Sequence, residues 1–146
     1  MAGRLDRLRS RFAGSGGIVQ DYLALSRDEE IHCAPVDWVA SEEWHRGHVV
    51  LIGDAGHAGS PMMGQGGCIA MADACVLAET LRTHATLTQA LDAYVARRRP
   101  RVSWVHEQNN AVAQSFRLPA AARNATLRPR GDEMLQRRFA PLLAAP

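Results

Sequence analysis

An acidic residue in a run of small residues is the first feature of this chain that could do chemistry. Asp54 is the first polar residue after the apolar run of residues 49–52 and Gly53. Its carboxylate could accept hydrogen bonds from a ligand hydroxyl, and the alanines and glycines after it would let an extended ligand approach the backbone. This pattern favours a sugar or polyol as the ligand.

A second group of small residues lies just before a long apolar segment. Its members are Gly64, Gln65, Gly66, Gly67 and Cys68. The first turn of a helix leaves backbone N–H groups unpaired and carries the positive end of the helix dipole, so this segment could face an anion or an electron-rich ring edge. The alternative is that the glycines only make tight turns and that Asp54 caps a local backbone group.

The elements expected to position these residues are a strand and a helix. The uninterrupted apolar run of residues 49–52 is typical of a strand buried on both faces of a parallel sheet. Residues 66–83 have few polar interruptions and predict a helix buried around much of its circumference. A loop between such a strand and helix occupies the place where open α/β sheets bind ligands.

Further helices are expected after this one. Thr86 and Gln89 have the spacing of a capping box and predict a helix that ends before Pro100. A third helix is expected to extend to about residue 116, after which Pro119, Pro129 and Gly131 should fragment the tail.

Composition bounds the class of protein. The chain has 146 residues, of which 47% are apolar, and a formal net charge of +2. No window approaches the roughly 18 uninterrupted apolar residues of a membrane span, and the N-terminus lacks the apolar segment of a secretory signal, so we expect a cytoplasmic protein with no membrane partner. The three cysteines form no CxxC pair, and Cys68 and Cys75 are expected to be small core residues.

Several polar residues have a structural interpretation. His45 and His48 lack nearby cysteine or carboxylate companions, so no metal site is predicted. The arginines of residues 97–101 have no interleaved aromatics and suit a helix C-terminus, so no nucleic-acid partner is expected. We expect His57 to be hydrogen-bonded within its loop, and Asp73 to serve the helix dipole or pair locally.

The order of these residues resembles a known motif. Gly53-Asp54-Ala55-x-His57, then Pro61, Gly64-Gln65-Gly66 and Asp73-Ala74, is similar to the second FAD-binding motif of p-hydroxybenzoate hydroxylase-like flavin monooxygenases, which are aromatic hydroxylases. The resemblance covers approximately residues 44–116. It implies that Asp54 binds a ribityl hydroxyl of FAD, that Pro61 packs beside the isoalloxazine, and that the backbone of residues 64–68 faces its pyrimidine end.

The resemblance also implies a reaction and a set of partners. NADPH or NADH would reduce FAD, and oxygen would then hydroxylate an aromatic or polyketide-like substrate. The family begins with a βαβ unit containing G-x-G-x-x-G, and this chain shows no such fingerprint. We therefore expect only the C-terminal part of a monooxygenase, completed by an N-terminal partner chain or by homo-oligomerisation.

The expected fold is α/β by family, but this chain should be mainly α with a few strands, an incomplete piece of a Rossmann-like FAD-binding domain. Residues 1–43 would derive from the middle domain, residues 44–118 from the FAD-binding domain, and residues 119–146 would form a tail. The alternative is a non-catalytic helical interaction module, or a truncated fragment, without bound flavin.

Overall fold

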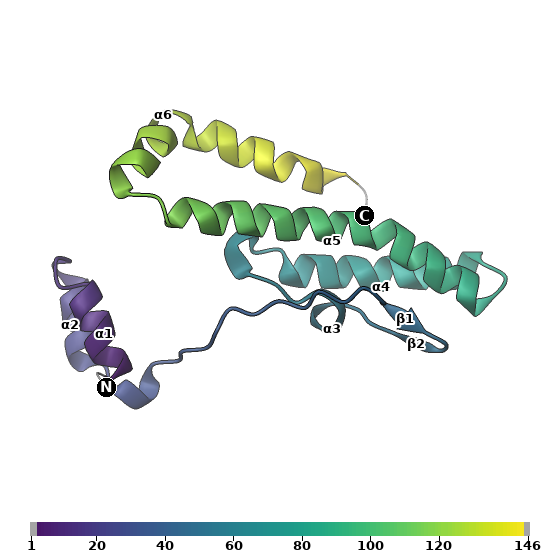
Figure 1. Cartoon of the computed structure of the whole chain (residues 1–146), viewed down its shortest axis with the longest axis horizontal. Coiled ribbons are helices and arrows are strands. Elements are labelled where there is room, and N and C mark those ends of the chain that lie inside the picture. The colour runs from purple at the N-terminus through teal and green to yellow at the C-terminus, as the bar shows by residue number, and fades with distance from the viewer. Residues whose placement is uncertain (1–2, 145–146) are drawn as a thin grey trace. The chain divides into compact units, whose positions relative to one another are not determined.

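Helices dominate the computed structural model, which describes residues 3–144 (Figure 1). The chain divides between Pro35 and Val36 into two compact units. In chain order the elements, with 3₁₀ helices written η, are α1 (Arg4–Arg11), α2 (Ile18–Leu25), η1 (Asp28–Glu30), β1 (His45–Arg46), β2 (Val49–Val50), α3 (Asp54–His57), η2 (Pro61–Met63), α4 (Gly66–Thr83), α5 (Leu87–Phe116), α6 (Ala120–Phe139) and η3 (Ala140–Leu143). The expectation of a mainly helical chain with few strands is confirmed.

The N-terminal unit is a hairpin of α1 and α2 followed by η1. Leu5 and Leu23 are its buried apolar residues. The Asp28 carboxylate accepts a hydrogen bond from the Leu5 amide at 2.8 Å, which ties η1 to the start of α1. Ile18 and Tyr22 on α2 are exposed, so this small unit leaves apolar surface uncovered.

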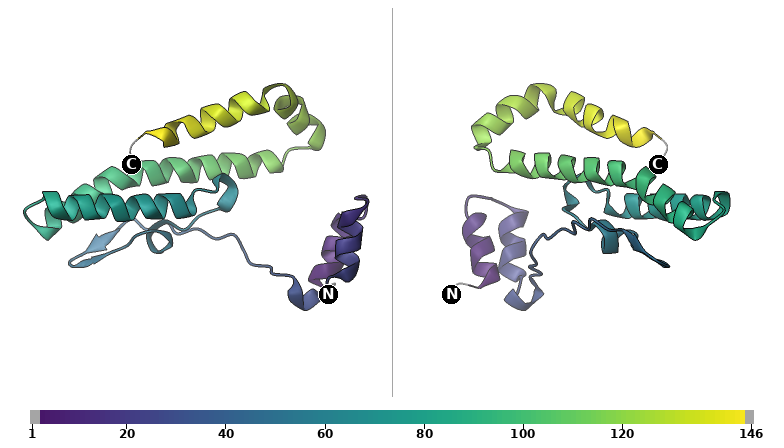
Figure 2. Two further views of the ribbon diagram at one scale, coloured as in Figure 1. Left: turned by 180° about the vertical axis from the view of Figure 1, so that it is seen from behind. Right: turned by 45° about the vertical axis from the view of Figure 1, so that its right-hand side comes forward.

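The C-terminal unit is built around α5. Figures 1 and 2 show α5 lying between α4 and α6 in each view. The core brings together α4, α5 and the segment before β1, and its buried cluster consists of Trp44, Ile69, Val76, Tyr94, Val102 and Val105. Burial of these side chains holds the two long helices together, because removing apolar area from water is the main favourable contribution to folding.

The apolar run of residues 49–52 does not form the expected buried parallel strand. β2 covers only Val49 and Val50 and pairs antiparallel with β1, with His45 opposite Val50. Val49 is 66% exposed. A parallel sheet requires neighbouring strands, and residues 3–144 contain only this two-stranded pair.

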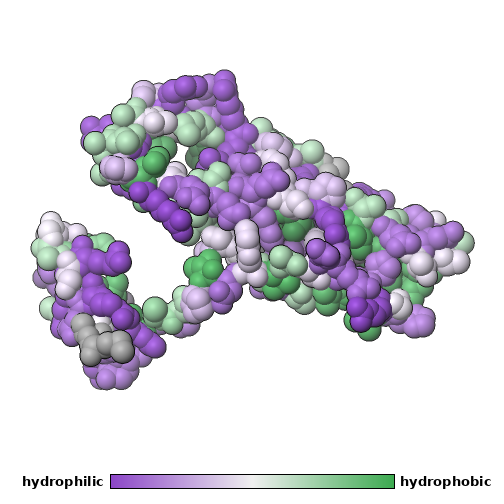
Figure 3. Space-filling model, viewed as in Figure 1, coloured by the Kyte–Doolittle hydropathy of each residue, from purple (hydrophilic) through white to green (hydrophobic). Residues whose placement is uncertain are grey.

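Helix α4 is buried along one face only, which corrects the second expectation. Its buried residues are Ile69, Asp73, Val76 and Thr80, at spacings of three and four. Met71 is 65% exposed, and Cys68 and Cys75 are also exposed rather than core residues. The reason is that α4 packs mainly on α5, so the opposite face has no covering layer among the described residues. Figure 3 shows hydrophobic residues reaching the surface in one view of the molecule.

Prolines end neither of the last two long helices. Thr86 caps α5 as expected, its Oγ1 accepting from the Gln89 amide at 3.3 Å, but α5 continues through Pro100 to Phe116. Helix α6 likewise runs through Pro129 and Gly131, so the breaks expected at these two residues are wrong, whereas Pro119 does lie between α5 and α6. Buried residues lie on both sides of Pro100 in α5, and their packing offsets the backbone hydrogen bond that proline removes.

No helix within residues 3–144 has both the length and the apolar character needed to cross a membrane.

Candidate functional site

Gly53 places Asp54 at the start of a short helical turn. Gly53 has φ 55° and ψ −140°, a conformation that favours glycine, and a Cβ added there would lie 3.1 Å from the Ala70 Cβ. The loop therefore lies directly on α4. Asp54 is the first residue of α3, and its side chain is exposed.

The second glycine group forms the beginning of α4. Pro61 opens η2, and Gly64 closes it in the left-handed conformation with φ 63°. Gln65 is the N-cap of α4, so Gly66, Gly67 and Cys68 form its first turn. A Cβ built on Gly66 or Gly67 would meet nothing within 4 Å. A side chain at either position would thus have no neighbour to displace, and the N–H groups of this first turn lack intrahelical partners, so a ligand could approach them.

Asp73 connects the Asp54 loop to the body of the protein. Its side chain is fully buried. Oδ2 accepts hydrogen bonds from the Gly53 amide at 2.9 Å and from His57 Nε2 at 2.5 Å. Burial alone would raise the pKa of this carboxyl, but the hydrogen bonds from His57, Arg98 and Gly53 together hold its pKa below the ordinary value. Asp73 is therefore a charged acceptor inside the core.

Arg98 balances that charge from α5. Its Nε donates to Asp73 Oδ1 at 2.8 Å and its Nη2 to the Ile69 carbonyl at 3.2 Å, and its side chain is fully buried. This contradicts the interpretation that the arginine run serves a helix C-terminus, because α5 continues for more than four turns beyond it. Burial, together with the negative charge of Asp73, also raises the pKa of the Tyr94 phenol.

Other contacts hold the rest of the loop against α5. His106 Nε2 donates to the His57 carbonyl at 3.0 Å. The Met63 amide donates to Asn109 Oδ1, buried on α5, at 2.8 Å. On the other side, the Val39 amide donates to the Ala58 carbonyl at 2.8 Å. The segment from Gly53 to Gly64 is thus fixed to both long helices.

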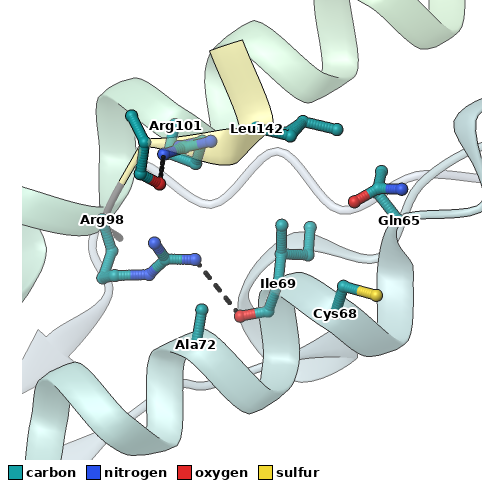
Figure 4. Close-up of a pocket in the computed structure, with 8 residues that line it drawn as sticks. Gln65, Cys68, Ile69, Ala72, Arg98, Arg101 and Leu142 are labelled. Atoms are coloured by element: carbon teal, nitrogen blue, oxygen red, sulfur yellow. Dashed lines mark hydrogen bonds between the residues drawn. The ribbon is translucent and has the colours of Figure 1, made fainter. Parts of the chain in front are cut away.

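A small pocket lies beside the first turn of α4 (Figure 4). Its walls come from α4, α5 and the chain end, and its lining residues are Gln65, Cys68, Ile69, Ala72, Arg98, Arg101, Leu142 and Ala144. Figure 4 shows the Arg98 guanidinium directed toward the Ile69 carbonyl across this space. The volume is about 170 Å³, below the roughly 300–1,000 Å³ of ordinary ligand pockets. The pocket is too small to be a complete ligand site.

Residues 3–144 contain no group of three or more histidine, cysteine or acidic side chains arranged to hold a metal ion. His45 instead bonds through Nε2 to Asp92 Oδ1 at 2.9 Å.

The comparison with protein families identifies this architecture. Residues 16–109 match the family described as FAD binding domain. The chain belongs to this FAD-binding family. The resemblance to aromatic-hydroxylase-type flavin monooxygenases is confirmed, since relatives that match this chain are named as FAD-dependent monooxygenases or hydroxylases. FAD is the cofactor of the family, and NAD(P)H is its typical co-substrate.

Two relatives illustrate how much of a complete protein the chain represents. YetM of Bacillus subtilis (strain 168), whose name groups it with the FAD-dependent monooxygenases, is 37% identical over 112 residues, covering 76% of this chain and 30% of YetM. The aurachin C monooxygenase/isomerase of Stigmatella aurantiaca is 45% identical over 82 residues, covering 56% of this chain and 20% of that protein. The chain therefore spans less than a third of either relative.

Solved structures share the fold. The tetracycline destructase Tet(51) matches with a TM-score of 0.68 at 24% identity, over 98% of this chain and 39% of that one. The R204Q variant of HpxO from Klebsiella pneumoniae, solved in complex with FAD, matches with a TM-score of 0.57 at 30% identity, over 77% of this chain and 32% of that one. The helices and loop described above are thus part of a FAD-binding monooxygenase fold.

The predicted site residues fall on two neighbouring places in this fold. Gly53 and Asp54 lie over α4 at Ala70, about one helical turn from Gly67 at the start of that helix. Sequence reasoning did not find the residues that hold them there: the partners of Asp73 are separated from it by 16, 20 and 25 positions. The only signal in the sequence was that Asp73 belongs to the motif.

Proposed function

We propose that this chain forms the second part of the flavin site in a FAD-dependent monooxygenase that hydroxylates an aromatic or polyketide-like molecule. The observation that carries the proposal is the adjacency of the Gly53–Asp54 turn to the open first turn of α4. One element offers a carboxylate to hydroxyl groups, and the other offers unpaired amides. A ribityl chain and the pyrimidine end of a flavin need these two kinds of partner.

The residue roles follow from where the side chains and amides lie. Asp54 is exposed and would accept hydrogen bonds from a ribityl hydroxyl. Pro61 is exposed at the start of η2 and would pack beside the ring system. Gly64, Gln65, Gly66, Gly67 and Cys68 would present backbone N–H groups to the ring edge. The glycines allow this approach because no side chain occupies the space in front of them.

When bound, FAD would supply the redox and oxygen chemistry of the reaction, with NAD(P)H as the source of reducing equivalents. The contribution of this chain is electrostatic. The positive end of the α4 dipole and its amides would stabilise negative charge that develops on the flavin edge, and they are already aligned for it.

The same proposal includes the rest of the protein. Residues 1–43 would belong to a middle domain, residues 44–118 to the FAD-binding domain, and residues 119–146 to a C-terminal extension. This chain would bind FAD by itself, an N-terminal partner chain or a second copy would raise the affinity by supplying the pyrophosphate-binding half, and the assembly would act in the cytoplasm. The exposed face of α4 supports a missing neighbour, because Met71 and Leu81 are open to solvent there.

A second candidate function is a helical interaction module without flavin. The observation that favours it is the exposed apolar surface of the N-terminal unit, where Ile18 is 82% and Leu25 is 84% exposed. Such surface is also compatible with the flavin-site proposal, in which the unit would pack against the rest of a middle domain.

Titration of the purified chain with FAD, followed by flavin fluorescence and absorbance, tests the proposal. Saturable binding is expected, and Asp54→Ala should raise the Kd about tenfold, as the loss of one or two hydrogen bonds from a charged acceptor would. Asp21→Ala on α2 is the matched control and should leave the Kd unchanged. Absence of saturable FAD binding, or equal Kd values for the wild-type chain and Asp54→Ala, would contradict the proposal.

A further inference from the structure

We propose that Asp73 is a positioning residue for the flavin site: its buried carboxylate fixes both ends of the turn that presents Asp54. The functional part of this inference rests on the proposed flavin site. The structural part stands on contacts within this chain.

One oxygen atom of Asp73 binds both ends of the turn that contains Asp54. Gly53 precedes Asp54, and its amide donates to Asp73 Oδ2 at 2.9 Å. His57 is the last residue of the same turn, and its Nε2 also meets Asp73 Oδ2, at 2.5 Å. The backbone closes the turn as well, because the Gly56 and His57 amides donate to the Gly53 carbonyl at 3.0 and 2.9 Å. Asp54 therefore lies between Gly53 and His57, which are both held by Asp73 Oδ2.

While Arg98 is present, the anchor has to be a carboxylate, because only a carboxylate has acceptors on both sides. Gly53, His57 and Arg98 all present N–H donors to residue 73, and a carboxylate offers oxygens on both sides of its carbon for them. A carboxamide would turn its NH₂ group toward one of these donors. Arg98 is fully buried and neutralises the charge, so the carboxylate does not face the core alone.

The geometry also explains why an external anchor is needed. Gly53 has φ 55° and ψ −140°, and α3 spans only four residues, too few to be stable as an isolated helix. The loop meets α4 at Ala70, one turn before Asp73 along the same helix. The first turn of α4 forms the other half of the proposed site. Because Asp73 lies on the same helix, it holds Asp54 in a fixed position relative to that first turn.

The test compares two variants in which the buried ion pair is gone. Asp73→Leu/Arg98→Met removes every acceptor at residue 73, and Asp73→Asn/Arg98→Met keeps a side-chain oxygen that can face Gly53. Both replace a buried charge pair with uncharged groups of similar size, which folded proteins often tolerate. The readout is amide hydrogen exchange at Gly53, resolved by NMR and expressed relative to Val76 in the core of α4, so that global stability cancels.

In the wild-type chain the Gly53 amide should be protected. The Leu/Met variant should exchange at Gly53 at least tenfold faster relative to Val76, and the Asn/Met variant should recover most of that protection. An unprotected Gly53 amide in the wild-type chain, or equal Gly53 protection in the two variants, would overturn the proposal without any reference to flavin.

FAD titration of the same proteins separates this inference from the proposed function. If the wild-type chain binds FAD, the Leu/Met variant should have a Kd about tenfold higher than the Asn/Met variant, and equal Kd values would overturn the positioning role. If the wild-type chain does not bind FAD, the proposed function fails, and the exchange data alone support or overturn the anchoring of the turn by Asp73.

Discussion

Asp73 and Arg98 form an ion pair in the centre of the C-terminal unit, with Asp73 Oδ1 2.8 Å from Arg98 Nε and both side chains fully buried. The pair joins α4 to α5 across 25 positions of sequence. Its carboxylate also holds the turn that carries Asp54, so the packing of the two helices and the geometry of the proposed flavin site depend on the same atoms.

Arg98→Met should destabilise the protein strongly. The change leaves Asp73 buried without its main cationic partner, and breaking a buried pair in this way costs about 3–5 kcal/mol. Arg97→Met is the matched control. Arg97 Nη1 contacts Glu79 Oε2 at 2.8 Å in a solvent-exposed pair, which contributes at most about 1 kcal/mol. Urea denaturation of both variants would measure the difference, and similar losses for the two would contradict the structure.

Stability should depend on acid through Asp73. The pKa of Asp73 is lower in the folded chain than its ordinary value, so the carboxylate contributes stability that is fully present above the unfolded pKa of about 3.9 and is lost as pH falls through the folded pKa. The free energy of unfolding of the wild-type chain should therefore fall more steeply below about pH 4 than that of Asp73→Leu/Arg98→Met. Urea titrations from pH 7 down to pH 2 give both curves, and parallel curves would show that Asp73 has an ordinary pKa.

Gly53→Ala should lower the free energy of unfolding more than a glycine-to-alanine change in a turn that has no close neighbours. Gly53 and Gly47 both have positive φ, of 55° and 57°, so alanine is strained by about 1–3 kcal/mol at either position. At Gly53 the new Cβ would also lie 3.1 Å from the Ala70 Cβ, whereas at Gly47 it would meet nothing within 4 Å. Thermal or urea unfolding of Gly53→Ala and Gly47→Ala should show the larger loss at Gly53. Equal losses would mean that the loop does not lie against α4.

Asn109→Leu should loosen the turn between the two halves of the proposed site. Asn109 Oδ1 is the acceptor for the Met63 amide, and removing it leaves a buried donor unpaired at a cost of about 1–3 kcal/mol. Asn110→Leu, an exposed neighbour on α5, should be nearly neutral. Amide exchange at Met63 should accelerate in the first variant only; unchanged exchange there would contradict the Asn109 contact.

Local patterns in the sequence predicted part of this structure. The Thr86 cap, a helix at residues 66–83 and the family resemblance built on Gly53 and Asp54 are all confirmed. Each depends on residues close together in the chain, where helix periodicity and turn chemistry act directly.

The remaining features depend on contacts between distant residues. The run at residues 49–52 is apolar enough for a central strand, but apart from β1 the described residues contain no strand to pair with it. A proline such as Pro100 normally indicates that a helix ends just before it. Tertiary packing overrides this preference in α5, which continues through Pro100. The Asp73 network joins four residues spread from Gly53 to Arg98, and no local pattern indicates which acidic and basic residues will meet in the core.

The most direct test of the central claim is the mapping of FAD binding onto backbone amides by two-dimensional ¹H–¹⁵N NMR. We predict saturable shifts concentrated at Gly53, Asp54 and residues 64–68, with little change in α6 or the N-terminal unit. No saturable shift, or shifts confined to residues outside these two segments, would contradict the assignment of this loop and helix terminus as a flavin site.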